Sequence, residues 1–364
     1  MSSPTDFAEP LSLAHGPAWK NRFMLAPLTN QQSHADGTLS DDEYRWLTMR
    51  AEGGFGLTMT CAAHVQAQGQ GFAGQLGVFG DEHLEGLMRL ADRIRACDSV
   101  SSVQLHHAGI RAAKEIVTDI VGPSEDAETG ARAMTTAEVE AARDAFIASA
   151  KRSEKAGFDG VEIHGAHGYL LAQFLSPELN RRDDKYGGSL ENRARLIMEV
   201  IEGIRSSCRS DFQLGLRLSP ERFGLKLAEV RDVAAEILRQ GKIDFLDMSL
   251  WDVFKEPVEE EFQGRSLLSY FAELPRGDVR LGAAGKIMSS RHVAEVLENG
   301  CDFAVIGRAA ILRHDFPRRV MADPAYTSPD LPVTAKHLSD EGLGDSFIKY
   351  MSGWKGFVAE EESA

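Results

Sequence analysis

Long apolar runs, paired cysteines and an excess of basic residues are all missing from this 364-residue sequence. No segment approaches the ~20 apolar residues that a membrane-spanning helix needs, and the N-terminal stretch lacks the basic and apolar regions of a secretory signal. Lys and Arg number 40 against 55 Asp and Glu, so the net charge of −15 disfavours binding to nucleic acid or to anionic membranes. We therefore expect a cytoplasmic protein with neither kind of partner.

Cysteines are few and far apart, and they lie at Cys61, Cys97, Cys208 and Cys301 with no Cys-x-x-Cys pair. This spacing argues against a structural zinc site, an iron–sulfur cluster or a redox-active disulfide. Isolated cysteines are usually small buried hydrophobic residues. A further absence is the Gly-x-Gly-x-x-Gly sequence that dinucleotide-binding sheets place after their first strand, because residues 26–29 are Ala-Pro-Leu-Thr.

What the sequence does contain is a regular alternation of short apolar runs with longer amphipathic stretches, which is typical of a parallel sheet with covering helices. Strands are predicted at residues 22–26, 56–61, 100–105, 160–164, 213–218, 245–249, 279–283 and 303–306. Helices are predicted at residues 41–53, 82–97, 136–156, 190–207, 228–240, 267–273, 290–298 and 309–321. Eight such units predict an α/β protein with a (β/α)8 TIM barrel, and a doubly wound sheet is the alternative.

Two predicted βα connections are too long for ordinary loops. We interpret the first long loop, residues 109–135, and the second long loop, residues 169–189, as extended active-site loops after strands three and four. Residues 323–364 contain three prolines and a short helix predicted at 344–351, and we expect them to form a C-terminal arm. Residues 1–364 are thus predicted to form a single barrel domain with this arm attached.

The predicted fourth strand ends in His164-Gly-Ala-His167-Gly-Tyr169, at the position where a barrel presents its catalytic groups. Two imidazoles three residues apart can donate hydrogen bonds to one oxygen, and a nearby phenol can deliver a proton. Two other interpretations stay open on these residues alone. One is a metal pair completed by a carboxylate or a third imidazole, and the other is two histidines that only satisfy a capped loop.

The stretch from His164 to Pro177 reads HGAHGYLLAQFLSP, and residues 180–193 read NRRDDKYGGSLENR. Together they resemble the signature of the Old Yellow Enzyme family of FMN-dependent ene-reductases. Further motifs of that family follow in order at residues 21–29, from Gln104 to Gly109, at Arg217, at Gly285-Lys286 and at Gly307-Arg308. The resemblance spans about residues 10–320.

This resemblance implies a noncovalent FMN, with NADH or NADPH as the reductant and no metal ion. Arg217 is expected at the N1/O2 edge of the flavin, Gln104 at its pyrimidine ring, and Thr29 as a hydrogen-bond donor to O4. The phosphate is expected at the loops after strands seven and eight, which supply Ala284, Gly285, Lys286, Gly307 and Arg308. The other implied cofactor contacts are Ala26, Pro27, Leu28, Ala62 and His164.

The implied activity is reduction of the C=C bond of α,β-unsaturated carbonyls or related electron-poor alkenes by NAD(P)H. In the mechanism of the family, His164 and His167 bind the carbonyl oxygen, flavin N5 delivers hydride to Cβ, and Tyr169 protonates Cα. Two other hypotheses are a barrel metallohydrolase that adds His106 or His107 to the histidine pair, and a flavin-binding redox sensor or storage protein. A homo-oligomer is compatible with the sequence.

Overall fold

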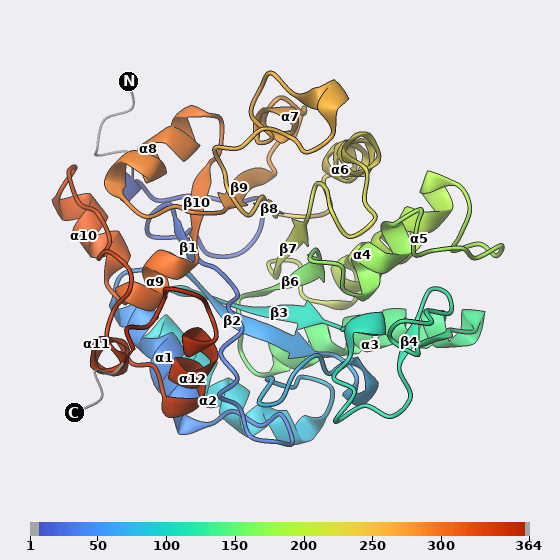
Figure 1. Ribbon diagram of the computed structural model, residues 1–364, viewed down its shortest axis with the longest axis horizontal. Coiled ribbons are helices and arrows are strands. Elements are labelled where there is room, and N and C mark those ends of the chain that lie inside the picture. Colours follow the sequence, from blue (N-terminus) through green and yellow to red (C-terminus); the bar gives the residue numbers. More distant parts are fainter. Residues whose placement is uncertain (1–6, 361–364) are drawn as a thin grey trace.

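The computed structural model of the chain describes residues 7–360 and contains one closed barrel of eight parallel strands (Figure 1). Its strands follow the cyclic order β1-β10-β9-β8-β7-β6-β3-β2. They are β1 (Phe23–Leu25), β2 (Leu57–His64), β3 (Val100–His106), β6 (Gly160–Gly165), β7 (Gln213–Leu218), β8 (Phe245–Ser249), β9 (Arg280–Ala284) and β10 (Phe303–Ile306). Because the closed sheet has no edges, the predicted TIM barrel is confirmed and the doubly wound alternative is wrong.

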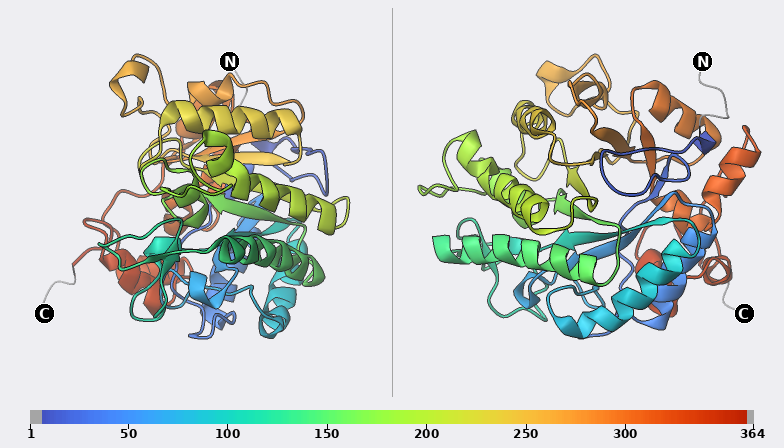
Figure 2. Two further views of the ribbon diagram at one scale, coloured as in Figure 1. Left: turned by 90° about the vertical axis from the view of Figure 1, so that its right-hand side faces the viewer. Right: turned by 180° about the vertical axis from the view of Figure 1, so that it is seen from behind.

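Helices surround the barrel on its outer side, as the two views in Figure 2 show. They are α1 (Asp41–Glu52), α2 (Leu84–Arg95), α3 (Thr136–Lys155), α5 (Leu190–Ser207), α6 (Leu227–Gln240), α7 (Ser269–Ala272), α8 (Ser290–Glu298), α9 (Arg308–Leu312) and α10 (Phe316–Ala322). Side-chain oxygens of Ser40, Thr135, Ser189 and Ser289 accept backbone N–H groups of the first turns and fix where four of these helices begin. Between residues 7 and 360, no helix is long and apolar enough to cross a membrane.

Two predicted helices differ from those in the structure. The helix predicted at residues 309–321 is divided into α9 and α10, and Pro317 lies in the first turn of α10. Proline has no N–H and its ring clashes with the carbonyl four residues earlier, so one continuous helix cannot pass through this position. Of the helix predicted at 267–273, only the single turn α7 forms.

Aromatic side chains fill the end of the barrel where the strands begin. Trp19 is fully buried there, and its segment pairs back onto Leu11. The Trp19 ring lies edge-on to Phe245 at 5.5 Å and to Phe303 at 4.8 Å between centroids. These two phenylalanines begin β8 and β10. This packed apolar plug leaves the opposite, C-terminal end of the strands for polar side chains.

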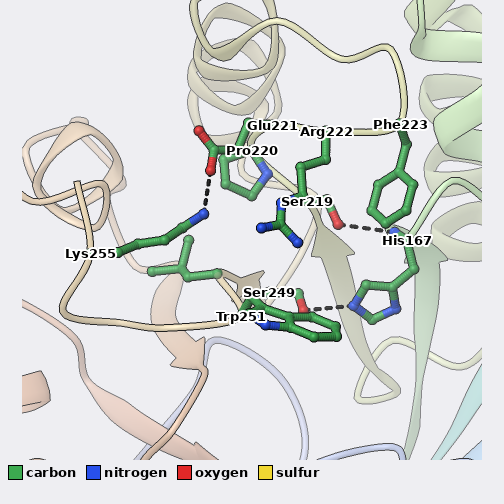
Figure 3. A pocket seen from close by; sticks show the side chains of 10 residues that line it. His167, Ser219, Pro220, Glu221, Arg222, Phe223, Ser249, Trp251 and Lys255 are labelled. Carbon is green, nitrogen blue, oxygen red and sulfur yellow. Dashed lines mark hydrogen bonds and ion pairs between the residues drawn. The ribbon is translucent and has the colours of Figure 1, made fainter. Parts of the chain in front are cut away.

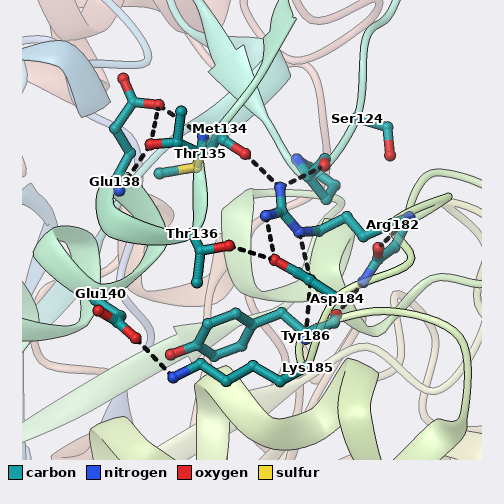
Figure 4. A network of polar contacts seen from close by, with 12 residues as sticks. Ser124, Met134, Thr135, Thr136, Glu138, Glu140, Arg182, Asp184, Lys185 and Tyr186 are labelled. Carbon is teal, nitrogen blue, oxygen red and sulfur yellow. Dashed lines mark hydrogen bonds and ion pairs between the residues drawn. The ribbon is translucent and has the colours of Figure 1, made fainter.

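The two long loops are bound to each other and to the start of α3 (Figure 4). Arg182 in the second long loop pairs with Asp184 and donates to the backbone carbonyl of Pro123 in the first long loop at 3.1 Å. Thr136 at the start of α3 donates to the same Asp184 carboxylate at 2.7 Å. Four short elements occur in these loops, namely η4 (Gly109–Arg111), β4 (Val121–Gly122), β5 (Arg132–Ala133) and α4 (Leu170–Leu175).

The C-terminal arm packs against the outside of α1 and contains α11 (Ala335–Asp340) and α12 (Asp345–Ser352). Phe347 of α12 lies edge-on to Trp46 of α1, with 4.9 Å between the ring centroids. The backbone N–H of Gly344 donates to the Gln32 side chain at 2.8 Å. The arm is therefore joined to the loop that follows β1, at the same end of the barrel as the predicted catalytic residues.

Candidate active site

The turn after β6 brings the three predicted catalytic rings together. His167 and Gly168 both adopt left-handed backbone conformations, with φ of 58° and 68°. This turn places the His167 ring 5.0 Å and the Tyr169 ring 5.3 Å from the His164 ring, measured between centroids. A left-handed histidine is uncommon, because its Cβ crowds the backbone, and such residues cluster at functional sites.

Both histidines of this turn are neutral at physiological pH. Burial lowers the pKa of His167 to about 3, with smaller contributions from nearby arginines, and it lowers the pKa of His164 well below the ordinary value. Nδ1 of His164 accepts the Ala166 N–H at 3.4 Å, which leaves Nε2 as the protonated nitrogen. Nε2 of His167 lies 2.7 Å from the Ser249 hydroxyl at the end of β8. Each neutral imidazole carries one N–H, and that of His167 is free for a ligand oxygen when its Nε2 accepts from the Ser249 hydroxyl.

Tyr169 has an environment that keeps its phenol protonated. Burial raises the pKa of Tyr169, and the nearby Arg111 guanidinium opposes this shift. Arg111 lies 4.9 Å above the Tyr169 ring and donates to the backbone carbonyl of His167, so it also holds the turn in place. On its other side the phenol ring contacts His106, 4.4 Å away between centroids. No described residue forms a hydrogen bond with the Tyr169 hydroxyl, which leaves it free to donate a proton.

Beneath the histidines, a layer of charged and amide side chains crosses the barrel interior. Nε2 of Gln104 donates to Glu162 at 2.7 Å, and Arg217 pairs with Asp247 at 3.0 Å. All four side chains are buried. Burial and the charge of Asp247 raise the pKa of Glu162, while burial raises the pKa of Asp247 against the opposing effect of Arg217. The Arg217 guanidinium is thus a fixed buried cation. It lies among carboxyl groups whose ionised form is disfavoured by burial.

The sequence analysis missed Asp247 and the pairing of Glu162 with Gln104. A signal was present, because Glu162 and Asp247 each lie two residues before a polar residue at a strand end, namely His164 and Ser249. Alternate residues of a strand share one face, so this spacing indicates a polar column on the barrel interior. The pairing itself depends on strand register, in which Gln104 lies opposite Glu162 and Arg217 opposite Asp247.

Gly307 follows the end of β10, and its backbone is uncrowded by the neighbouring side chains. A Cβ added to Gly307 would meet nothing closer than the Leu28 side chain at 3.7 Å and the Ala26 side chain at 4.0 Å. Arg308 follows directly, and its guanidinium has no carboxylate partner between residues 7 and 360. A glycine with an uncrowded backbone and an unpaired cation therefore occur together where the phosphate of FMN is expected.

The neighbouring loop after β9 is tightly packed. Gly285 has φ of 148°, and a Cβ there would lie 2.6 Å from the Asp252 backbone nitrogen, so only glycine fits without movement. Lys286 follows with its ammonium 2.8 Å from the Asp252 carboxylate. The preceding Ala284 is in register with Val305 of β10, which places the two predicted phosphate loops side by side.

The remaining predicted residues also lie at this end of the barrel. Pro27 and Thr29 are half-buried just after β1, and Ala62 of β2 is in register with Gln104. The unpaired polar atoms beneath this region include Nε2 of His106, which is buried without a partner among the described residues. Within residues 7–360 no group of three or more His, Cys, Asp or Glu side chains is arranged to hold a metal ion.

These features fit FMN better than a metal ion. A buried cation and an amide lie at the centre, with neutral imidazoles above them, and Gly307 and Arg308 can contact a phosphate. The side chains of Ala26, Ala62 and Ala284 at the strand ends are small. The fold and the site therefore define a flavin-binding barrel.

Comparisons with known proteins agree. The model of the NADH:flavin oxidoreductase / NADH oxidase family matches residues 7–325. The chain is 34% identical over 331 residues to the probable NADH-dependent flavin oxidoreductase YqiG of Bacillus subtilis (strain 168), covering 88% of this chain and 86% of that protein. It is 35% identical over 326 residues to NADPH dehydrogenase of the same organism, covering 86% and 94%. The Old Yellow Enzyme structure from Pichia sp. AKU4542 has a TM-score of 0.77 at 25% identity, covering 92% of this chain and 90% of that one.

The chain belongs to the NADH:flavin oxidoreductase / NADH oxidase family, which is the Old Yellow Enzyme family predicted from the sequence. It is an FMN-dependent enzyme that uses NAD(P)H. This assignment confirms the predicted cofactors. It sets aside both the metallohydrolase and the non-enzymatic flavin protein that the residues alone left open.

Proposed function

We propose that this enzyme reduces the C=C bond of α,β-unsaturated carbonyls or related electron-poor alkenes. The observation that supports this most is the turn after β6, where two neutral imidazoles and a protonated phenol lie with ring centroids 5.0 to 6.5 Å apart. Such a turn offers two hydrogen-bond donors for one carbonyl oxygen and one acid beside them. When bound, FMN takes a hydride from NAD(P)H and supplies it to the alkene.

His164 and His167 bind the carbonyl oxygen through their N–H groups and stabilise the negative charge that develops there during reduction. Both imidazoles are uncharged, so neither needs a counterion, and their buried setting strengthens each hydrogen bond. Tyr169 gives its hydroxyl proton to Cα. Arg111, close to the Tyr169 ring, stabilises the phenolate that remains until a solvent proton replaces the one transferred.

In the same proposal a larger set of residues holds the cofactor. Arg217 faces the N1/O2 edge of the flavin, where a fixed cation favours the reduced form, and Gln104 is oriented by Glu162 toward the pyrimidine ring. Residues at the ends of β1, β2, β9 and β10 complete the site. They are Ala26, Pro27, Leu28, Thr29, Ala62, Ala284, Gly285, Lys286, Gly307 and Arg308.

The proposal is tested by measuring the two half-reactions separately in His164→Ala and His167→Ala. We expect flavin reoxidation by a cyclic enone to slow by roughly a hundredfold in each variant, since losing one oxyanion donor costs about 3 kcal/mol. Flavin reduction by NAD(P)H should change much less. His34→Ala removes an exposed imidazole and serves as the control. If stopped-flow traces show both half-reactions unchanged in both variants, the assignment of the oxyanion donors is wrong.

A further inference from the structure

The loops that follow β7 and β8 form a small pocket with His167 at one side, and the proposed chemistry gives no role to the residues that these loops contribute (Figure 3). Trp251 of the β8 loop is 62% exposed, more than any other aromatic residue among the described ones. Its backbone is left-handed, with φ of 66°. Exposing a large apolar ring to water is unfavourable, and such exposed rings often mark binding sites. The flat face of the Trp251 indole is therefore available to a ligand.

A cation without a counterion lies over this indole. The Arg222 guanidinium is 5.7 Å from the Trp251 ring centroid, and Figure 3 shows it pointing into the pocket. No carboxylate between residues 7 and 360 pairs with it. The adjacent Glu221 is already occupied, because it pairs with Lys255 and accepts the Val258 N–H at 2.8 Å.

This unpaired cation matters in a chain with a net charge of −15. An anionic ligand is repelled by such a molecule as a whole, so its binding depends on local positive charge at the mouth of the site. A second arginine, Arg111, lies 5.6 Å from the Phe223 ring on the same rim. Among the described residues its guanidinium donates to the backbone carbonyl of His167 and pairs with no carboxylate.

The indole is also fixed relative to the predicted phosphate loop. The N–H groups of Leu250 and Val253, on either side of Trp251, donate to the carbonyls of Ala284 at 3.0 Å and Gly285 at 3.2 Å. The pocket therefore lies between His167 on one side and the β9 loop on the other. A ligand that reached from the histidine pair toward solvent beside His167 would pass over Trp251 and Arg222.

We propose that Trp251 and Arg222 bind the adenosine diphosphate half of NAD(P)H while its nicotinamide lies at His164 and His167. A planar adenine can stack on the exposed indole, and a guanidinium is well suited to pair with diphosphate oxygens. The small neutral alkenes of the proposed function carry neither group. This inference rests on the proposed function, which makes His164 and His167 the donors to a carbonyl oxygen, because the nicotinamide carboxamide carries such an oxygen.

The test compares NAD(P)H with a hydride donor that lacks the adenosine diphosphate half, such as 1-benzyl-1,4-dihydronicotinamide. In Arg222→Ala and Trp251→Ala, the apparent Kd for NAD(P)H in stopped-flow flavin reduction should rise roughly tenfold, which is the loss of one charge-assisted or stacking contact. Reduction by the truncated donor should be unchanged. Trp251→Phe keeps a flat ring and should stay close to the wild type. Arg231→Ala removes an exposed arginine on α6 and is the matched control.

A second readout needs no turnover. ADP-ribose, which lacks nicotinamide, should bind the FMN-loaded protein in a calorimetric titration and should lose most of its affinity in Arg222→Ala and Trp251→Ala. Unchanged ADP-ribose affinity in both variants, or equal weakening of NAD(P)H and the truncated donor, would overturn the proposal. So would an effect confined to alkenes that carry a carboxylate, because the pocket would then bind the substrate. Failure to reduce any enone, with the donor difference intact, would refute the proposed substrate class and support this pocket.

Discussion

At the scale of single residues, burial sets the protonation states that the chemistry needs. It lowers the pKa of the two imidazoles and raises that of the phenol, so all three groups are neutral and bear a proton at pH 7. The sequence analysis predicted that His164, His167 and Tyr169 lie together after the fourth strand and supply these groups. It could not predict that Ser249 would engage His167 or that Arg111 would cover Tyr169, since these contacts join different βα units.

Tyr169→Phe is the sharpest residue-scale test, because it removes one oxygen and leaves the ring packing on His106 intact. If Tyr169 is the acid, flavin reoxidation by simple enones should slow by about 10²-fold or more in stopped-flow measurements. Flavin reduction by NAD(P)H should be nearly unchanged. The structural reason is that the hydroxyl is free of any hydrogen bond to the described residues, so its loss does not disturb a network.

Nitroalkenes provide the internal control for this variant. The nitronate formed from a nitroalkene is a stable anion that can leave without being protonated. Flavin reoxidation by a nitroalkene should therefore survive in Tyr169→Phe while the protonated product fails to accumulate. Equal slowing with enones and nitroalkenes would mean that Tyr169 shapes the pocket and that the proton comes from another group.

At the scale of elements, hydrophobic periodicity located the strands well and the irregular segments poorly. β7, β8 and β10 and the helices α5 and α8 have the predicted bounds, because each combines a regular apolar pattern with a clear start or stop. The division of the predicted helix at 309–321 follows from Pro317. In the second long loop, Arg182 binds the first long loop and Asp184 accepts from Thr136 at the start of α3, so part of the family signature is structural. The hydrophobic periodicity of strands and helices contains no information on such contacts between loops.

Docking of the C-terminal arm depends on Glu341, a buried carboxylate just after α11. It pairs with Arg313 at 2.9 Å and accepts from the ring and backbone N–H of His314 at 2.6 and 2.7 Å. Burial alone would raise the pKa of Glu341, but these hydrogen bonds outweigh it and lower the pKa to about 2. The ionised form is thus favoured in the folded protein.

Glu341→Gln should reduce the free energy of unfolding by about 2 kcal/mol at pH 7, since hydrogen bonds to a charged group are lost. A lowered carboxyl pKa gives stability that is complete above the ordinary value near pH 4.5 and disappears as the pH falls toward 2. The difference between variant and wild type in urea unfolding should therefore shrink across that range. Glu115→Gln changes an exposed carboxylate and should show no such difference. A difference independent of pH would contradict the role of the charge.

At the scale of the whole molecule, eight repeated βα units were enough to predict the barrel and the end that carries the site. The plug formed by Trp19 was not predictable, because it depends on an N-terminal segment packing against β8 and β10, far along the chain. Charge likewise has one part that the sequence predicts and another that only the structure reveals. The total charge of −15 follows from the composition. The unpaired positive charges of Arg308 and Arg222 are apparent only in the folded structure, where their surroundings are known.

The unpaired positive charge of Arg308 leads to a prediction on the retention of FMN. Arg308→Ala should weaken the binding of FMN by roughly tenfold, because the phosphate loses a charge-assisted contact. The loss should be larger at low salt, since the repulsive field of the whole chain extends about 30 Å at 0.01 M salt but only about 10 Å at 0.1 M. FMN released on dilution, followed by its fluorescence at the two salt concentrations, measures both effects.

Lys336→Ala is the matched control, because it also removes one positive charge. Its ammonium is paired with Asp340 at 2.8 Å and is 82% exposed on α11. If the effect of Arg308 were only a change in net charge, the two variants would release FMN alike at each salt concentration. We expect instead that Lys336→Ala retains FMN as the wild type does, because a screened charge on the arm contributes little at Gly307 and Arg308. Equal release from both variants would place the phosphate away from Arg308.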